Sequence, residues 1–178
     1  MDLRLSSQLL VTMPGLKLIH LFRDPRGQLN SHIHTRWYGL NESNIKDVED
    51  DVLALCERMR KDLTTARRLL EEFPGRFKIV QYEDFDNLMD KSRKLYEFVG
   101  MEFDDKAETL VTQLRPKHGR AGFHPFSYRD SLRWQSVKLV NEHCSDLYKD
   151  LHYNIFQTET DLRNHSIPAL SGPLPFSL

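Results

Sequence analysis

The sequence has little of what marks several large classes of protein. Only two cysteines, Cys56 and Cys144, occur in 178 residues, which is too few for a disulfide-rich scaffold or a cysteine zinc site. No apolar run approaches the ~18 residues of a membrane span. The N-terminus also lacks the charged-then-apolar order of a signal peptide. The eight histidines show no zinc-ligand spacing, so we predict no metal.

The net charge is also small, at −1, but the charges are unevenly distributed. Residues 20–36 and 115–133 are both basic, whereas residues 42–51 are acidic. Two separate basic segments in a near-neutral chain indicate an anionic ligand between them and no nucleic-acid surface, although ordinary solvated charge is the alternative. The length predicts a single domain, residues 1–178, with an irregular lead-in at 1–16 and an irregular tail at 157–178.

Hydrophobic patterns along the chain predict an α/β protein. Short apolar runs predict buried strands, and 3.6-residue periodicity predicts amphipathic helices. A turn and a helix follow the first strand, with Asp24 as the N-cap and Pro25 at the first helical position. The expected strands are Leu18–Phe22 and Phe77–Gln81, and the other expected helices are 48–73, Leu88–Val99, 104–114 and 136–151.

Three residues around this turn recur at every fourth position: Arg23, Gly27 and Ser31. Arg23 leaves the carboxyl end of a strand, where α/β sheets bind ligands, and Gly27 and Ser31 share one helix face. A guanidinium, a position without a side chain and a hydroxyl beside a helix N-terminus suit a phosphate. The alternative is that Arg23 only pairs with Asp24 or caps the turn.

Four segments carry a family resemblance. LFRDPRGQLNS at 21–31 resembles the 3′-phosphate-binding motif of sulfotransferases that use 3′-phosphoadenosine 5′-phosphosulfate (PAPS), and it is most similar to carbohydrate 6-O-sulfotransferases acting on Gal, GalNAc or GlcNAc. FKIVQYEDF at 77–85, RDSLRW at 129–134 and DLRNHSIPAL at 161–170 resemble later family segments in the same order. The resemblance implies a P-loop nucleotide-kinase-like fold, a parallel sheet flanked by helices. It would be N-terminally incomplete here, because residues 1–16 show no 5′-phosphosulfate loop.

The resemblance also implies the ligands and their contacts. PAPS would be the co-substrate, with its 3′-phosphate held by Arg23 and Ser31 across Gly27. Tyr82 would contact the adenine, unless it only packs and hydrogen-bonds Glu83 or the backbone. A loop over the nucleotide would contribute Lys117 and Arg129. The catalytic residues stay unknown, because their expected place is the missing loop.

The function that the resemblance implies is transfer of a sulfonate to the 6-hydroxyl of a glycan, of the keratan or chondroitin sulfate type. Relatives are type II membrane proteins of the Golgi lumen, and their N-terminal anchor is not in this sequence. The alternative is a non-catalytic remnant that binds nucleotide or sulfated glycan. Cys56 and Cys144 correspond to cysteines of relatives and are either buried apolar residues or a disulfide. Sequons at Asn41 and Asn164 fit a lumenal glycoprotein.

Overall fold

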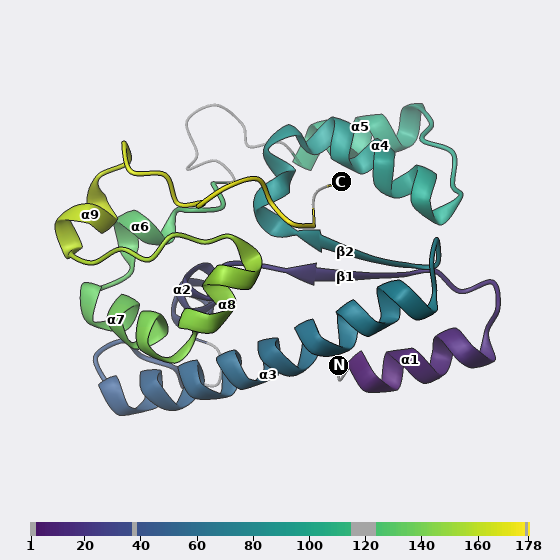
Figure 1. Cartoon of the computed structure of the whole chain (residues 1–178). Helices are drawn as coiled ribbons and strands as arrows, with labels where there is room; N and C mark the ends of the chain where they lie inside the picture. The colour runs from purple at the N-terminus through teal and green to yellow at the C-terminus, as the bar shows by residue number, and fades with distance from the viewer. Residues whose placement is uncertain (1–2, 37–38, 115–123, 177) are drawn as a thin grey trace. The chain divides into compact units, whose positions relative to one another are not determined.

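The computed structural model describes residues 3–36, 39–114, 124–176 and 178 (Figure 1). Their contacts divide the chain into two compact units. Unit 1 comprises residues 1–22, 66–125 and 176–178, and unit 2 comprises residues 23–65 and 126–175. That these residues form a single sulfotransferase domain stays a prediction.

The sheet of unit 1 has the two strands that the sequence predicts. β1 (Leu18–Phe22) and β2 (Phe77–Gln81) pair in parallel, with Leu18 opposite Phe77 and Phe22 opposite Gln81. Parallel neighbours need a crossover connection, and the chain between them is largely helical. The helix-rich α/β architecture with a small parallel sheet is therefore confirmed.

The prediction that β1 is fully buried is wrong. Leu21 is 50% exposed and Ile19 is 36% exposed, whereas Phe22 is 2% exposed. Successive residues of a strand point to opposite faces, so Ile19 and Leu21 share a face that the described chain leaves open. A short apolar run identified the strand, but it gave no information on how many faces would be covered.

The N-terminal residues of unit 1 form a helix, which corrects the predicted irregular lead-in at 1–16. α1 (Leu3–Thr12) buries Leu3, Ser6 and Leu10 along one side, which is the spacing of one helix face. At its C-terminal end the guanidinium of Arg76 donates to the carbonyls of Leu10, Met13 and Leu16. Only Leu10 of the three belongs to α1, and its carbonyl lies in the last turn, where carbonyls lack a partner within the helix. A residue far along the chain therefore completes the end of α1 and holds the residues that follow it.

The remaining elements of unit 1 follow β2. They are a 3-10 helix, η2 (Tyr82–Asn87), and the helices α4 (Leu88–Val99) and α5 (Asp105–Leu114). α4 ends as predicted at Gly100, whose φ of 81° lies in the left-handed region that glycine adopts without strain.

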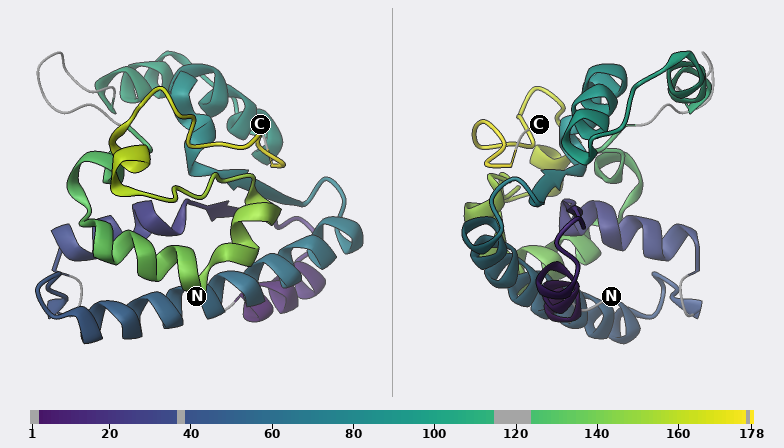
Figure 2. Two further views of the ribbon diagram at one scale, coloured as in Figure 1. Left: turned by 60° about the vertical axis from the view of Figure 1, so that its left-hand side comes forward. Right: turned by 90° about the vertical axis from the view of Figure 1, so that its right-hand side faces the viewer.

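Unit 2 is helical. Its elements are α2 (Pro25–His34), most of α3 (Ile45–Glu72), α6 (Tyr128–Ser131), α7 (Trp134–His143), α8 (Ser145–Leu151) and α9 (Glu159–Arg163). Figure 2 shows α7 in green alongside the first half of the long α3 in both views. The core is apolar and includes Leu29, Val48, Val52, Leu55, Met59, Val137, Val140, Leu147 and Phe156.

Two predictions for the C-terminal part need correction. The expected helix 136–151 is broken at Cys144, whose φ of −115° is not helical, and the break lets α7 and α8 bury separate apolar faces. The tail at 157–178 is not wholly irregular, because it contains α9. A capping box begins this helix, in which Thr158 and Asp161 each accept the other's backbone N–H.

Candidate functional site

The turn from β1 into α2 has the local structure that the sequence predicts. The Asp24 carboxylate accepts the backbone N–H of Arg26 at 2.9 Å and so caps α2, and Pro25 occupies the first helical position. Both features fix the residue at which α2 begins. The turn is therefore a fixed support for the side chains on either side of it.

Arg23, Gly27 and Ser31 lie together on one side of α2. The Nη1 of Arg23 donates to the Ser31 Oγ at 2.9 Å. The guanidinium passes directly over Gly27, since a Cβ built there would lie 3.0 Å from the Arg23 Nε and 3.5 Å from its Cζ. The structure thus brings together the three residues singled out by their spacing.

This arrangement can hold a doubly charged oxyanion. A guanidinium presents donors in a planar fork, and the serine hydroxyl adds a donor. Arg23 and Ser31 are both half-buried, and Gly27 is buried. A ligand oxygen between Arg23 and Ser31 would be partly shielded from water, which strengthens charge-assisted hydrogen bonds.

Gly27→Ala tests this geometry. The added methyl would be tighter against the Arg23 guanidinium than ordinary packing allows, so we expect Arg23 to shift and affinity for adenosine 3′,5′-bisphosphate to fall severalfold. Alanine raises helix propensity by ~1 kcal/mol, so the melting temperature should hold or rise. Calorimetric titration and thermal melts measure the two effects, and unchanged affinity would contradict the proximity argument.

A second arginine of the motif has a role that sequence reasoning missed. Arg26 and Asp24 are both fully buried and form a two-pronged ion pair, with Arg26 Nε 2.9 Å and Nη2 2.8 Å from the Asp24 carboxylate oxygens. Arg26 Nη1 donates to the carbonyl of Asn154 at 2.8 Å. The carboxylate that the predicted alternative assigned to Arg23 is therefore paired with Arg26.

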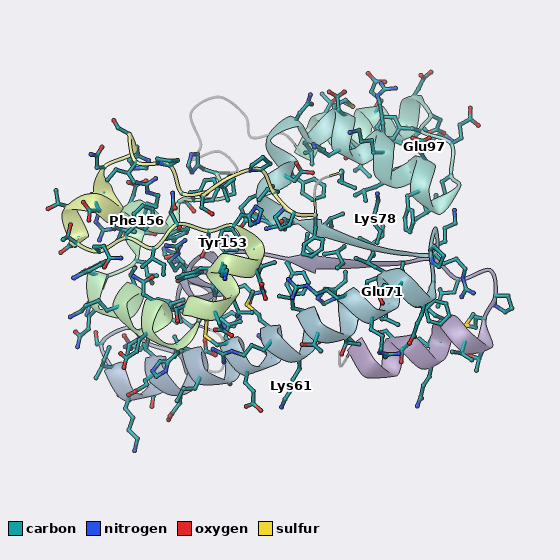
Figure 3. The ribbon with its side chains drawn as sticks, viewed as in Figure 1. Lys61, Glu71, Lys78, Glu97, Tyr153 and Phe156 are labelled. Atoms are coloured by element: carbon teal, nitrogen blue, oxygen red, sulfur yellow. A yellow bond between two sulfur atoms is a disulfide. The ribbon has the colours of Figure 1, made fainter. Side chains whose placement is uncertain are left out.

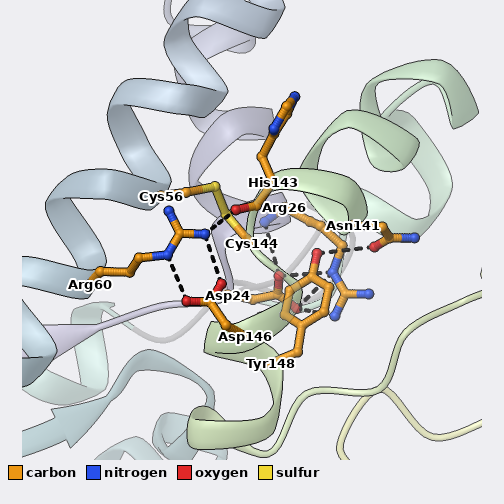
Figure 4. The surroundings of a disulfide bond; sticks show 9 residues. All are labelled: Asp24, Arg26, Cys56, Arg60, Asn141, His143, Cys144, Asp146 and Tyr148. Carbon is orange, nitrogen blue, oxygen red and sulfur yellow. Dashed lines mark hydrogen bonds and ion pairs between the residues drawn. A yellow bond between two sulfur atoms is a disulfide. The ribbon is translucent and has the colours of Figure 1, made fainter.

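Aromatic rings enclose this ion pair. The Arg26 guanidinium lies 5.0 Å from the ring centre of Tyr128, 4.6 Å from that of Tyr148 and 5.1 Å from that of Phe156. The Tyr128 hydroxyl donates to Asp24 at 2.9 Å. Figure 4 shows Asp24, Arg26 and Tyr148 together, and Figure 3 labels Phe156. We call Asp24, Arg26, Tyr128, Tyr148 and Phe156 the buried arginine cluster.

The ionisation states in the cluster follow from its surroundings. Burial is the largest single influence and opposes the charged form of Arg26, but Asp24, Tyr148 and Tyr128 together outweigh it and raise the pKa of the guanidinium. Burial is the main cause of the raised pKa of Tyr128, followed by the nearby Asp24 charge. Arg26 is therefore a fixed cation inside unit 2, and it supports the turn that carries Arg23.

The guanidinium of Arg129, a predicted nucleotide contact, is engaged in contacts within unit 2. It is 3% exposed, and its guanidinium donates to the carbonyls of Leu162, Asn164 and Ile167 at 2.8, 2.6 and 2.9 Å. The side chain holds α9 and the residues after it. Its donors are used within unit 2, and we therefore leave Arg129 out of the proposed site.

The structure does not test the predicted nucleotide contacts of Tyr82 and Lys117. Tyr82 is half-buried and begins η2 directly after β2. It belongs to unit 1 whereas Arg23 belongs to unit 2, so its contact with adenine stays a prediction. Lys117 lies outside the described residues. Within the described ranges, no group of histidine, cysteine, aspartate or glutamate is arranged to hold a metal ion.

Cys56 and Cys144 form a disulfide, with Cα atoms 5.4 Å apart. The bond joins α3 to the α7–α8 junction (Figure 4). Beside it, Arg60 of α3 contacts both carboxylate oxygens of Asp146 at 2.6 and 2.7 Å. The predicted pairing is confirmed, and the covalent and ionic links attach α8, which carries Tyr148, to α3.

None of the described helices is long and apolar enough to cross a membrane.

Comparison with known proteins identifies the family. The sequence model of the sulfotransferase family matches residues 3–105, a range that contains Arg23, Gly27, Ser31 and Tyr82. This range is more than half of the chain, and the chain belongs to the sulfotransferase family.

The curated relatives are carbohydrate sulfotransferases. Carbohydrate sulfotransferase 1 of Mus musculus is 25% identical over 174 residues, covering 86% of this chain and 42% of the relative. Carbohydrate sulfotransferase 4 of Mus musculus is 25% identical over 92% of the chain and 49% of its own length. Carbohydrate sulfotransferase 2 of Homo sapiens is 25% identical over 89% of the chain and 38% of its own length. The chain thus spans less than half the length of these relatives, and no solved structure matches it.

Proposed function

We propose that this chain is the 3′-phosphate-binding part of a carbohydrate sulfotransferase that uses PAPS. The observation that carries the proposal is the Arg23–Ser31 contact at 2.9 Å across the bare face of Gly27. A terminal 3′-phosphate has the charge and size for this site, and the buried arginine cluster supports the turn behind it. The named relatives, carbohydrate sulfotransferases, support a sugar as the acceptor.

The chemistry proposed is transfer of a sulfonate from PAPS to a sugar hydroxyl, the 6-hydroxyl of a keratan- or chondroitin-type glycan. PAPS supplies the activated sulfonate when it is bound. Arg23 and Ser31 bind the 3′-phosphate and so orient the donor, but they do not touch the reacting sulfur. Tyr82 would stack against the adenine, which a flat amphipathic ring suits. The proposed location is the Golgi lumen, and the proposed fold is P-loop nucleotide-kinase-like.

Arg23→Ala and Ser31→Ala test the proposal. A charge-assisted contact contributes ~1.5–3 kcal/mol and a neutral hydrogen bond about 1 kcal/mol. We therefore expect adenosine 3′,5′-bisphosphate to bind more than tenfold more weakly to the arginine variant and about fivefold more weakly to the serine variant. Isothermal titration calorimetry measures both losses.

Adenosine 5′-monophosphate is the matched ligand, because it lacks only the 3′-phosphate. Its affinity should be low and nearly equal for the wild type and both variants. Equal affinity of the wild type for the two nucleotides would contradict a 3′-phosphate site. It would favour a remnant without donor specificity.

A further inference from the structure

A pocket of about 510 Å³ lies in unit 2 beyond the C-terminal end of α2. Its volume is within the ~300–1,000 Å³ typical of small-molecule sites. Its walls come from the last turn of α2, from the chain that follows it and from Arg133, the residue before α7. The lining includes Ile33, Arg36, Leu40, Asn41, Glu42 and Arg133.

Arg36 occupies a backbone position that favours glycine. It is the second residue after α2, and its φ is +50°. Helices often end with glycine in this left-handed conformation, because a Cβ there is strained. A cation that only complemented the negative end of α2 could stand at Thr35, whose φ is −86°. The strain at Arg36 therefore points to a use for its side chain.

The charged groups around the pocket leave the Arg36 guanidinium able to bind a ligand. Glu42 is the acidic lining residue, and its Oε1 already accepts the backbone N–H of Arg133 at 2.8 Å and the Ser136 hydroxyl at 2.9 Å. Its other oxygen is 3.6 Å from the Arg133 Nε. Among the described residues, the exposed Arg36 guanidinium makes no hydrogen bond or ion pair. Two cations and one engaged carboxylate leave the pocket with a net positive charge.

The rest of the lining suits a sugar ring. Ile33 and Leu40 supply apolar surface, and Glu42 supplies a carboxylate. A sugar presents C–H groups on one side and hydroxyls around its edge, so mixed walls of this kind match it. A lone sulfate would leave most of the volume unfilled.

We propose that this pocket binds an acidic sugar residue, with Arg36 and Arg133 holding its sulfate or carboxylate group. The site is separate from the Arg23–Ser31 site, and only the choice of a saccharide rests on the proposed function. The recognition of an oxyanion by two guanidiniums follows from the lining residues alone.

The direct test is binding of galactose 6-sulfate, glucuronic acid and galactose to the full chain, measured by ligand-observed NMR. We expect the two acidic sugars to bind at least tenfold more tightly than galactose. Arg36→Gly should reduce that binding by roughly the same factor while keeping or raising the melting temperature, because glycine relieves the strained φ. A folded variant with lost binding separates the role in the ligand site from a role in stability.

Arg58→Ala is the matched control, since it removes one exposed positive charge from α3 in the same unit without altering the pocket. It should bind the acidic sugars as the wild type does. Galactose 6-sulfate bound no better than galactose, or inorganic sulfate bound as well as galactose 6-sulfate, would overturn the proposal. Retained binding in Arg36→Gly would overturn it too.

The nucleotide serves to distinguish this proposal from the proposed function. Arg36→Gly should bind adenosine 3′,5′-bisphosphate normally, and Arg23→Ala should bind the acidic sugars normally. If only the predicted nucleotide binding fails, the proposed function is wrong and the acidic-sugar pocket stands. If only the predicted sugar binding fails, the pocket proposal is wrong and the 3′-phosphate site stands.

Discussion

Replacing Arg26 with methionine is expected to destabilise the protein by about 3–5 kcal/mol. The change removes one member of a fully buried ion pair and leaves the Asp24 carboxylate without its compensating charge. It also leaves the Asn154 carbonyl without its donor. Urea unfolding followed by intrinsic fluorescence measures the loss. Binding of the bisphosphate nucleotide should weaken as well, because the cap of α2 would be disturbed.

Arg60→Ala is the matched control for Arg26→Met. Arg60 also forms a two-pronged pair with an aspartate, but its side chain is 42% exposed and that of Asp146 is 55% exposed. Exposed pairs contribute ~1 kcal/mol or less. Equal losses of unfolding free energy in the two variants would show that burial does not determine how much the Arg26–Asp24 pair contributes to stability.

Removing the disulfide should have an effect of similar size. Cys56 and Cys144 are separated by 88 residues, and loss of a native bond that closes so long a loop typically costs ~2–5 kcal/mol. The double variant Cys56→Ser, Cys144→Ser should unfold at a correspondingly lower urea concentration. Dithiothreitol should shift the wild type toward the variant and leave the variant unchanged. A wild type insensitive to dithiothreitol would contradict the expectation.

The parts of the fold that the sequence predicted depend on neighbouring residues. The start of α2 could be read from Asp24 and Pro25, because a cap and a first-turn proline act within a few residues. The grouping of Arg23, Gly27 and Ser31 could be read in the same way, since α2 fixes Gly27 and Ser31 and Arg23 directly precedes its N-cap. Helix α4 ends at Gly100 for an equally local reason.

The parts that could not be predicted depend on residues far apart in the chain. The structural role of Arg26 could not be predicted, because the tyrosines that enclose it lie more than 100 positions later. Arg129 looked like a free cation for the same reason, since its carbonyl partners belong to a tail with no strong pattern of its own. The exposed face of β1 and the break at Cys144 likewise depend on what packs beside them.

The buried arginine cluster also fixes when unit 2 can be completed during synthesis. Asp24 and Arg26 emerge from the ribosome early, but their partners are 104 residues away at Tyr128 and 128 residues away at Asn154. Contacts between such distant positions form late, because the intervening chain must first be ordered. Until Phe156 has emerged, the N-terminal end of α2 carries a charged pair with no enclosing rings. A nascent chain that stalls before that point therefore exposes the turn on which nucleotide binding would depend.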